Sequence, residues 1–168
     1  MYERILVPTD GSVGVERAVE HALDLAAAHG ATVHAVYVVN SASFASLPME
    51  TSWDGLTDVL RAEGEAALDR VRKLGAEQGV HVEGVVRDGS PSQEIVMHAN
   101  AVGADIIVMG THGRGGIDRL LLGSVAERVV RSSPIPVLTV QVSDSGKPDE
   151  GIDLDQTTEP AADAESDA

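Results

Sequence analysis

Hydrophobic residues recur along this chain in two alternating patterns. Short runs rich in β-branched residues, typical of strands buried on both faces of a sheet, alternate with segments in which apolar residues return every three or four positions, typical of helices. The runs predict strands at Arg4–Val7, Thr32–Val39, Val80–Arg87, Asp105–Met109 and Pro136–Val142. The helical spacing predicts helices from Val15 to Gly30, from Leu56 to Ala76, from Ser90 to about Val102, and one that carries Val125, Val129 and Val130 before Ser132-Ser133-Pro134.

This strict alternation predicts the fold class. It is typical of a parallel sheet whose right-handed crossover helices cover both faces. We therefore predict an α/β fold in three layers, with an open parallel five-stranded sheet between two helical layers. The helix that starts near Ser90 has the capping-box spacing Ser90-Pro91-Ser92-Gln93, with proline at its first position.

The distribution of charge predicts one domain and a tail. Residues 1–143 contain no visible internal repeat and a single set of alternating elements, so we expect one domain there. Residues 144–168 hold nine acidic residues against Lys147 alone, without a periodic apolar face. Such a segment cannot offset its ordering entropy by burial, so we interpret it as a disordered acidic tail.

Composition excludes several classes of protein. The net charge of −15 and the low aromatic content argue against nucleic-acid binding, which needs basic grooves and stacking platforms. No apolar run approaches the roughly 20 residues that span a bilayer, and the first residues do not have the pattern of a signal peptide. Zero cysteines exclude disulfides and thiolate metal sites. We expect a soluble, cytoplasmic protein without nucleic-acid or membrane partners.

The excess of acidic over basic residues also bears on the salt environment of the source organism. Lysine supplies only Lys73 and Lys147 of the 12 basic residues. An acidic, lysine-poor surface suits high ionic strength, where self-repulsion is screened, so we hypothesise a halophilic source. The alternative is a protein of ordinary salt environments with a solubilising tail.

A glycine-rich loop is the candidate binding feature. In open parallel sheets, ligands bind at the carboxyl ends of the strands where the strand order reverses. The loop after the predicted fourth strand reads Gly110-Thr111-His112-Gly113-Arg114-Gly115-Gly116, and the next helix is introduced by Gly123-Ser124-Val125. Glycines let a ligand approach the main chain, and the amides of a helix start attract anions without a lysine. The alternative is a plain surface loop.

The spacing Gly110-x2-Gly113-x9-Gly123-Ser124 resembles the ATP-binding motif of the universal stress protein family. The likeness extends over residues 2–142, from the opening at Ile5–Ser12 to the close at Ser133–Leu138. It implies a sheet of order 3-2-1-4-5, of the adenine nucleotide alpha hydrolase-like type. It also implies ATP bound at the switch point between the first and fourth strands, with Mg²⁺ held mainly by the phosphates.

The resemblance also assigns roles to residues. It implies adenine and ribose contacts from Pro8, Thr9 and Asp10, backbone bonds to the adenine edge from Val38, ribose contacts from Met109 and Gly110, room for the ribose and α-phosphate at Gly113, and β- and γ-phosphate contacts from Gly123, Ser124 and Val125. From the residues alone, Asp10 has the alternative interpretation of a turn residue beside Gly11.

Charged and titratable side chains near the loop have two interpretations each. Arg114 and Arg119 are candidate phosphate partners, because a guanidinium matches phosphate geometry; solvent exposure is the alternative. For His112 we favour a packing or solvent role. The other histidines lie in separate elements, so we predict no metal site built from protein ligands alone.

The motifs that are missing bear on activity. The sequence has no Walker A lysine motif, no kinase signature and no His-x-Gly-His motif of the related nucleotidyl-transferases. We therefore expect an ATP-binding, stress-response regulatory protein that acts as a nucleotide-dependent dimeric switch, with slow hydrolysis at most. One alternative is a dimeric interaction scaffold independent of nucleotide. Another is an FMN-binding, flavodoxin-like protein, against which the few aromatics argue.

The resemblance also implies partners. Family members dimerise through the last strand, here residues 137–142, and we expect a homodimer together with a regulatory protein partner of unknown identity. The segment Ser41–Asp54 lacks a clear period and carries two of the four aromatics. It is either a lid over the nucleotide or a mobile surface loop.

Overall fold

The computed structural model describes residues 1–40, 53–112 and 122–141. The strands are β1 (Arg4–Pro8), β2 (Thr32–Val39), β3 (Val82–Asp88), β4 (Ile106–Gly110) and β5 (Val137–Val140). The helices are α1 (Val13–His29), α2 (Trp53–Glu77), α3 (Pro91–Val102) and α4 (Ser124–Ser132). These elements follow the predicted order with bounds shifted by a few residues. The predicted tail lies outside the described residues, as do residues 41–52 of the possible lid. The last two residues of the predicted loop Ser41–Asp54 belong instead to the first turn of α2.

The strands form one parallel sheet of order β3-β2-β1-β4-β5, as predicted. The central strand β1 pairs with β2 from Arg4 to Pro8 and with β4 at Ile5 and Leu6. The chain builds β2 and β3 on one side of β1 and then returns to build β4 and β5 on the other. The connections therefore diverge at the carboxyl ends of β1 and β4, which is where an open α/β sheet leaves a crevice.

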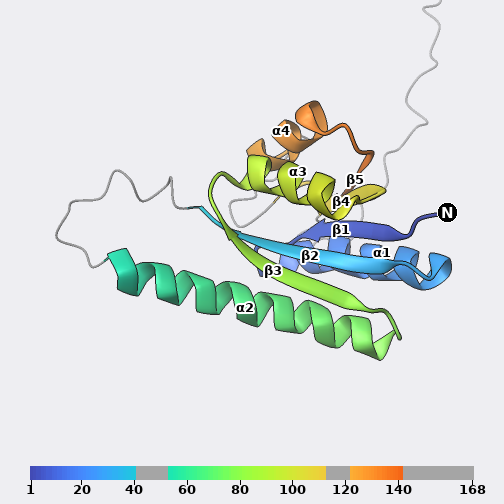
Figure 1. Ribbon diagram of the computed structural model, residues 1–168, viewed down its shortest axis with the longest axis horizontal. Helices are drawn as coiled ribbons and strands as arrows, with labels where there is room; N and C mark the ends of the chain where they lie inside the picture. Colours follow the sequence, from blue (N-terminus) through green and yellow to red (C-terminus); the bar gives the residue numbers. More distant parts are fainter. Residues whose placement is uncertain (41–52, 113–121, 142–168) are drawn as a thin grey trace, which may run out of the picture.

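Helices cover both faces of the sheet (Figure 1). Ile5 and Val7 pack toward α1 and α2, whereas Leu6 packs toward α3 and α4, and all three are fully buried. A central strand with both faces covered buries successive side chains on alternate faces, which explains the apolar run Ile5–Val7. Tyr37 is the one aromatic residue in the described part of the core. Among the described helices, none is both long enough and apolar enough to cross a membrane.

Asp105 fixes the start of the central strand. Its Oδ2 accepts hydrogen bonds from the backbone N–H groups of Arg4, at 2.9 Å, and Glu3, at 2.7 Å. These two bonds stabilise the carboxylate and lower its pKa below the ordinary value. Because Asp105 immediately precedes β4, this contact holds β1 and β4 together at the end of the sheet opposite the crevice.

The start of α3 differs from the sequence prediction in one respect. Ser90 is the N-cap and Pro91 the first helical residue, as expected, but the side chain of Ser90 makes no capping hydrogen bond. The capping box is therefore absent. Pro91 presets the backbone angle of the first turn and brings no N–H to satisfy, and the carbonyl of Ser90 accepts the N–H of Glu94 at 2.9 Å.

Two histidines lie between the sheet and α3. The Nδ1 atom of His34, on β2, lies 3.4 Å from Oε2 of Glu83. Burial lowers the pKa of His34 and outweighs the opposing attraction of Glu83, with Arg4 and His81 adding smaller decreases. Burial likewise lowers the pKa of His98, helped by the charges of Arg87 and His34. Among the described residues, Nδ1 of His98 is buried without a hydrogen-bond partner.

These histidines predict a loss of stability on acidification. Their folded-state pKa values lie below the ordinary histidine value of about 6.5. The unfolded chain therefore binds more protons, and the free energy of unfolding falls as the pH drops through 6.5 toward the folded values. We expect the double variant His34→Gln, His98→Gln to show a shallower fall between about pH 7 and pH 5, measured by denaturant unfolding. His21→Gln, on the exposed surface of α1, is the matched control. A double variant with the slope of the parent would contradict this account.

Candidate functional site

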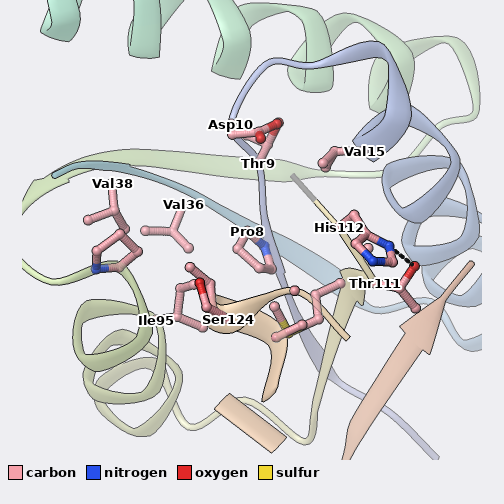
Figure 2. A pocket seen from close by; sticks show the side chains of 16 residues that line it. Pro8, Thr9, Asp10, Val15, Val36, Val38, Ile95, Thr111, His112 and Ser124 are labelled. Atoms are coloured by element: carbon pink, nitrogen blue, oxygen red, sulfur yellow. Dashed lines mark hydrogen bonds between the residues drawn. The ribbon is translucent and has the colours of Figure 1, made fainter. Parts of the chain in front are cut away.

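A cavity of about 350 Å³ opens at the carboxyl ends of β1, β2 and β4 (Figure 2). It lies at the predicted switch point between β1 and β4. The structure brings together in its lining every described residue that the motif comparison had singled out, namely Pro8, Thr9, Asp10, Val38, Met109, Gly110, Gly123, Ser124 and Val125. Gly113 and Arg114, the two other predicted site residues, and the candidate Arg119 lie outside the described residues.

One end of the cavity is an apolar slot that the motif comparison had missed. Val36 lies two residues before Val38 on β2, so the two side chains share a face of the sheet. Pro91 and Ile95 lie four residues apart on α3 and line the same cavity. Figure 2 shows Val36, Val38 and Ile95 together at one end of the cavity. Such a slot suits a flat, largely apolar ring.

The backbone of Val38 adds a donor and an acceptor to this slot. Successive residues of β2 direct their N–H and C=O groups alternately to the two neighbouring strands. The carbonyl of Val36 accepts the N–H of Thr9 on the β1 side at 2.9 Å, whereas that of Val39 accepts a bond from the β3 side. Val38 is therefore directed toward β1, but the paired part of β1 ends at Pro8. The backbone N–H and C=O of Val38 therefore face the cavity, at the point where the chain after Pro8 leaves the sheet.

The loop between β1 and α1 holds Asp10 at the cavity. Oδ1 of Asp10 accepts hydrogen bonds from the N–H of Ser12, at 2.9 Å, and from its hydroxyl, at 2.6 Å. Oγ1 of Thr9 accepts the N–H of Gly11 at 3.2 Å. Gly11 has a φ of 74°, in the left-handed region that favours glycine. Asp10 is thus a turn residue and a cavity residue at once, so its two interpretations do not exclude each other.

The other polar feature is the start of α4. Its N-cap is Gly123, whose N–H donates to the carbonyl of Thr111 at 2.7 Å and whose carbonyl accepts the N–H of Glu127 at 2.9 Å. No side chain in the described part of the chain caps this helix. The N–H groups of residues 124–126 belong to the first turn, which has no intrahelical acceptors. All three residues line the cavity, so their amides and the positive end of the helix dipole favour an anion there.

The loop after β4 packs directly against this helix start. A Cβ atom placed on Gly123 would lie 3.2 Å from the carbonyl oxygen of Thr111 and 3.6 Å from Cα of His112. The N–H of Thr111 donates to the carbonyl of Val140 on β5 at 2.9 Å. Thr111 therefore connects the edge strand β5 with the start of α4 through its two backbone groups.

His112 also lies in the cavity lining, although the sequence had favoured a packing or solvent role. Its Nδ1 is 3.1 Å from the hydroxyl oxygen of Thr111. Figure 2 shows both residues at the end of the cavity away from Val36 and Val38. Within the described ranges, no group of three or more His, Asp or Glu side chains is arranged to bind a metal ion. The arrangement combines an apolar slot with an anion-binding helix start.

Comparison with known proteins identifies relatives of this chain. The sequence model described as "Universal stress protein family" matches residues 1–141. Universal stress protein MJ0531 of Methanocaldococcus jannaschii is 44% identical over 141 residues, which cover 84% of this chain and 83% of that protein. Universal stress protein YxiE of Bacillus subtilis is 31% identical over 148 residues, covering 84% of this chain and all of that protein.

Solved structures share the fold. The structure of MJ0577 from Methanocaldococcus jannaschii superposes with a TM-score of 0.77 at 33% identity, covering 86% of this chain and 99% of that chain. A universal stress protein solved in complex with cAMP superposes with a TM-score of 0.64 at 29% identity, covering 84% and 98%. From the match of the family model and the identity to these relatives, the chain belongs to the universal stress protein family.

Proposed function

We propose that this protein is an ATP-binding regulator of the stress response that acts as a nucleotide-dependent dimeric switch. The observation that carries the proposal is the start of α4, whose uncapped amides at residues 124–126 line the same cavity as the apolar slot. One cavity thus combines an apolar surface for a base with backbone amides for phosphates. The relative solved with cAMP supports an adenine nucleotide as the ligand.

The described residues fit an adenine nucleotide in size and chemistry. A cavity of about 350 Å³ falls within the usual range of small-molecule sites, roughly 300–1,000 Å³. The slot of Val36 and Ile95 would hold adenine, with the backbone of Val38 at the polar edge of the base. Asp10 would bind the ribose, and the start of α4 the phosphates. Mg²⁺ would enter with ATP and be held mainly by the phosphates.

Binding rather than turnover is the proposed activity. Rapid hydrolysis needs a positioned water, a base or orienting group, and cations that stabilise the transferring phosphoryl group. Among the described lining residues, Asp10 is the one carboxylate, and neither lysine nor arginine is present. Asp10 belongs to the proposed ribose end and not to the phosphate end. We propose a turnover below about 1 s⁻¹, the low end for ordinary enzymes.

The proposal extends to the cellular setting. The net charge of −15 with two lysines among 12 basic residues supports a salt-rich cytoplasm. There, screening shortens the repulsion between the acidic surface and a triphosphate to about 3 Å at 1 M salt. Molar salt is therefore the reference condition for the measurements below.

Calorimetric titration with Mg-ATP tests nucleotide binding. We expect the parent to bind and Gly123→Val to lose at least about tenfold in affinity, because its Cβ would lie 3.2 Å from the carbonyl oxygen of Thr111 and displace the helix start from the loop after β4. Ser124→Ala removes a hydroxyl but keeps the amide, and should lose roughly three- to tenfold. Gly55→Val is the matched control, since a Cβ at Gly55 has no atom within 4 Å.

Two results would contradict the nucleotide proposal. One is a parent protein that shows neither heat nor affinity with Mg-ATP in molar salt. The other is equal binding by the parent, Gly123→Val and Ser124→Ala. Denaturing the purified parent and identifying any released nucleotide by chromatography provides independent support for the ligand.

The dimer is proposed to form through β5. All four residues of Val137–Val140 are half-buried, and among the described strands β5 pairs with β4 alone. An edge strand of this kind offers unpaired N–H and C=O groups to a second copy. Because Thr111 bonds both Val140 and Gly123, this edge is connected to the proposed phosphate end. The same edge also favours the second candidate, a scaffold that dimerises without nucleotide. The proposed switch also acts on a downstream regulatory protein, whose identity is unknown.

Light scattering in molar salt tests the dimer and separates the two candidates. Pro136 and Val140 direct their carbonyls to β4, so by alternation Thr139 directs its N–H to the open edge. Thr139→Pro removes that donor and leaves the β4 pairing intact. We expect a dimeric parent, a monomeric Thr139→Pro variant, and a dimeric Thr139→Val control. Dimer affinity that changes with Mg-ATP supports the switch, and dimer affinity that does not change supports the scaffold. A monomeric parent would contradict both.

A further inference from the structure

Helix α2 contacts the loop that carries Asp10 through one described hydrogen bond. Nη2 of Arg70 donates to the carbonyl oxygen of Gly11 at 3.0 Å. Beside this contact, a small cavity of about 20 Å³ is lined by residues of α1, α2 and the loop, including Arg70 and Gly11. Asp10 lies at the side of the larger cavity nearest α2 (Figure 2). The guanidinium therefore holds the loop from outside the proposed nucleotide cavity.

The loop's own hydrogen bonds leave its distance from α2 unspecified. Asp10 bonds to Ser12, and Thr9 bonds to Gly11, so these contacts shape the turn internally. The N–H of Thr9 fixes the beginning of the loop against β2, at the carbonyl of Val36. Beyond that bond, among the hydrogen bonds between described residues, the Arg70 contact connects the turn to α2, which packs on the same face of the sheet as α1. Gly11, at a φ of 74°, presents its carbonyl for it.

Arg70 differs from the other arginine of this stretch of α2. Over residues 1–40, 53–112 and 122–141, Arg70 forms no ion pair, and its side chain donates a hydrogen bond to the carbonyl of Gly11. Arg72 makes a similar bond to the carbonyl of Gly84 on β3 at 3.1 Å, and a second to Asp69 at 2.7 Å. Both arginines thus tie α2 to a backbone carbonyl, but only the contact of Arg70 reaches a segment of the cavity lining.

We propose that Arg70 is a positioning residue for the nucleotide site and acts through Gly11 on Asp10. This inference rests on the proposed function, because Asp10 is the proposed ribose ligand. Without the guanidinium, the turn keeps its internal bonds but loses its support from α2. The carboxylate of Asp10 then spends less time at the position that binds the nucleotide, and the affinity falls without the removal of any group that touches the ligand.

Titration of Arg70 variants with Mg-ATP tests this inference. We expect Arg70→Ala to weaken binding roughly three- to tenfold, the range for one hydrogen bond. Arg70→Lys keeps a cationic donor and should remain within about twofold of the parent. Arg72→Ala is the matched control, because it loosens α2 from β3 and not from the loop. Thermal unfolding of each variant, recorded alongside, separates a loss of affinity from a loss of fold.

The outcomes separate this inference from the proposed function. A loss in Arg70→Ala that Arg70→Lys restores and Arg72→Ala does not share supports the positioning role. Equal affinity of Arg70→Ala and the parent overturns the role and leaves ATP binding standing. An equal loss in Arg70→Ala and Arg72→Ala also overturns it, because the effect then belongs to α2 as a whole. A parent that does not bind Mg-ATP overturns the proposed function itself.

Discussion

The pairing of β1 with two parallel neighbours is the constraint on which the rest of this structure depends. Ile5 is paired with Val33 of β2 on one side and with Ile106 of β4 on the other. Two elements that lie far apart in sequence are thereby placed against one strand, held at its start by Asp105. Past Pro8 the pairing with β2 stops, and the loops separate. The apolar centre of the sheet thus determines where the crevice opens.

The sequence was sufficient for the sheet but not for the finer helix contacts. Buried parallel strands need unbroken aliphatic runs, so the runs themselves predict the elements and their order. The pattern of α4 is less informative, because it predicts one apolar set of Val125, Val129 and Val130. Val129 is fully buried and Val130 is 45% exposed, since adjacent helical residues point about 100° apart. The prediction of a capping box at Ser90 was also wrong. The spacing of residue types alone does not show which backbone N–H groups of the first turn need a side-chain acceptor.

The candidate site was predictable where a motif covered it. The glycine spacing and the opening at Pro8–Asp10 led to residues that the fold brings into one cavity. The apolar slot was missed because Val36 and Ile95 belong to elements without a motif, and they meet only when α3 packs over β2. Their one signal in the sequence was position, near the end of a strand and at the start of a helix. Backbone groups, such as those of Val38, have no signature in residue type at all.

The main-chain groups that line both ends of the cavity have an evolutionary consequence. On the proposed function, the amides that begin α4 and the polar groups of Val38 are contributed by the fold and survive most replacements of side chains. Mutation can then change the charge of the surface, here to a net charge of −15 for the chain, without removing the backbone atoms that bind. Adaptation to a habitat and retention of a ligand become separable, which lets one architecture persist through large drifts in composition.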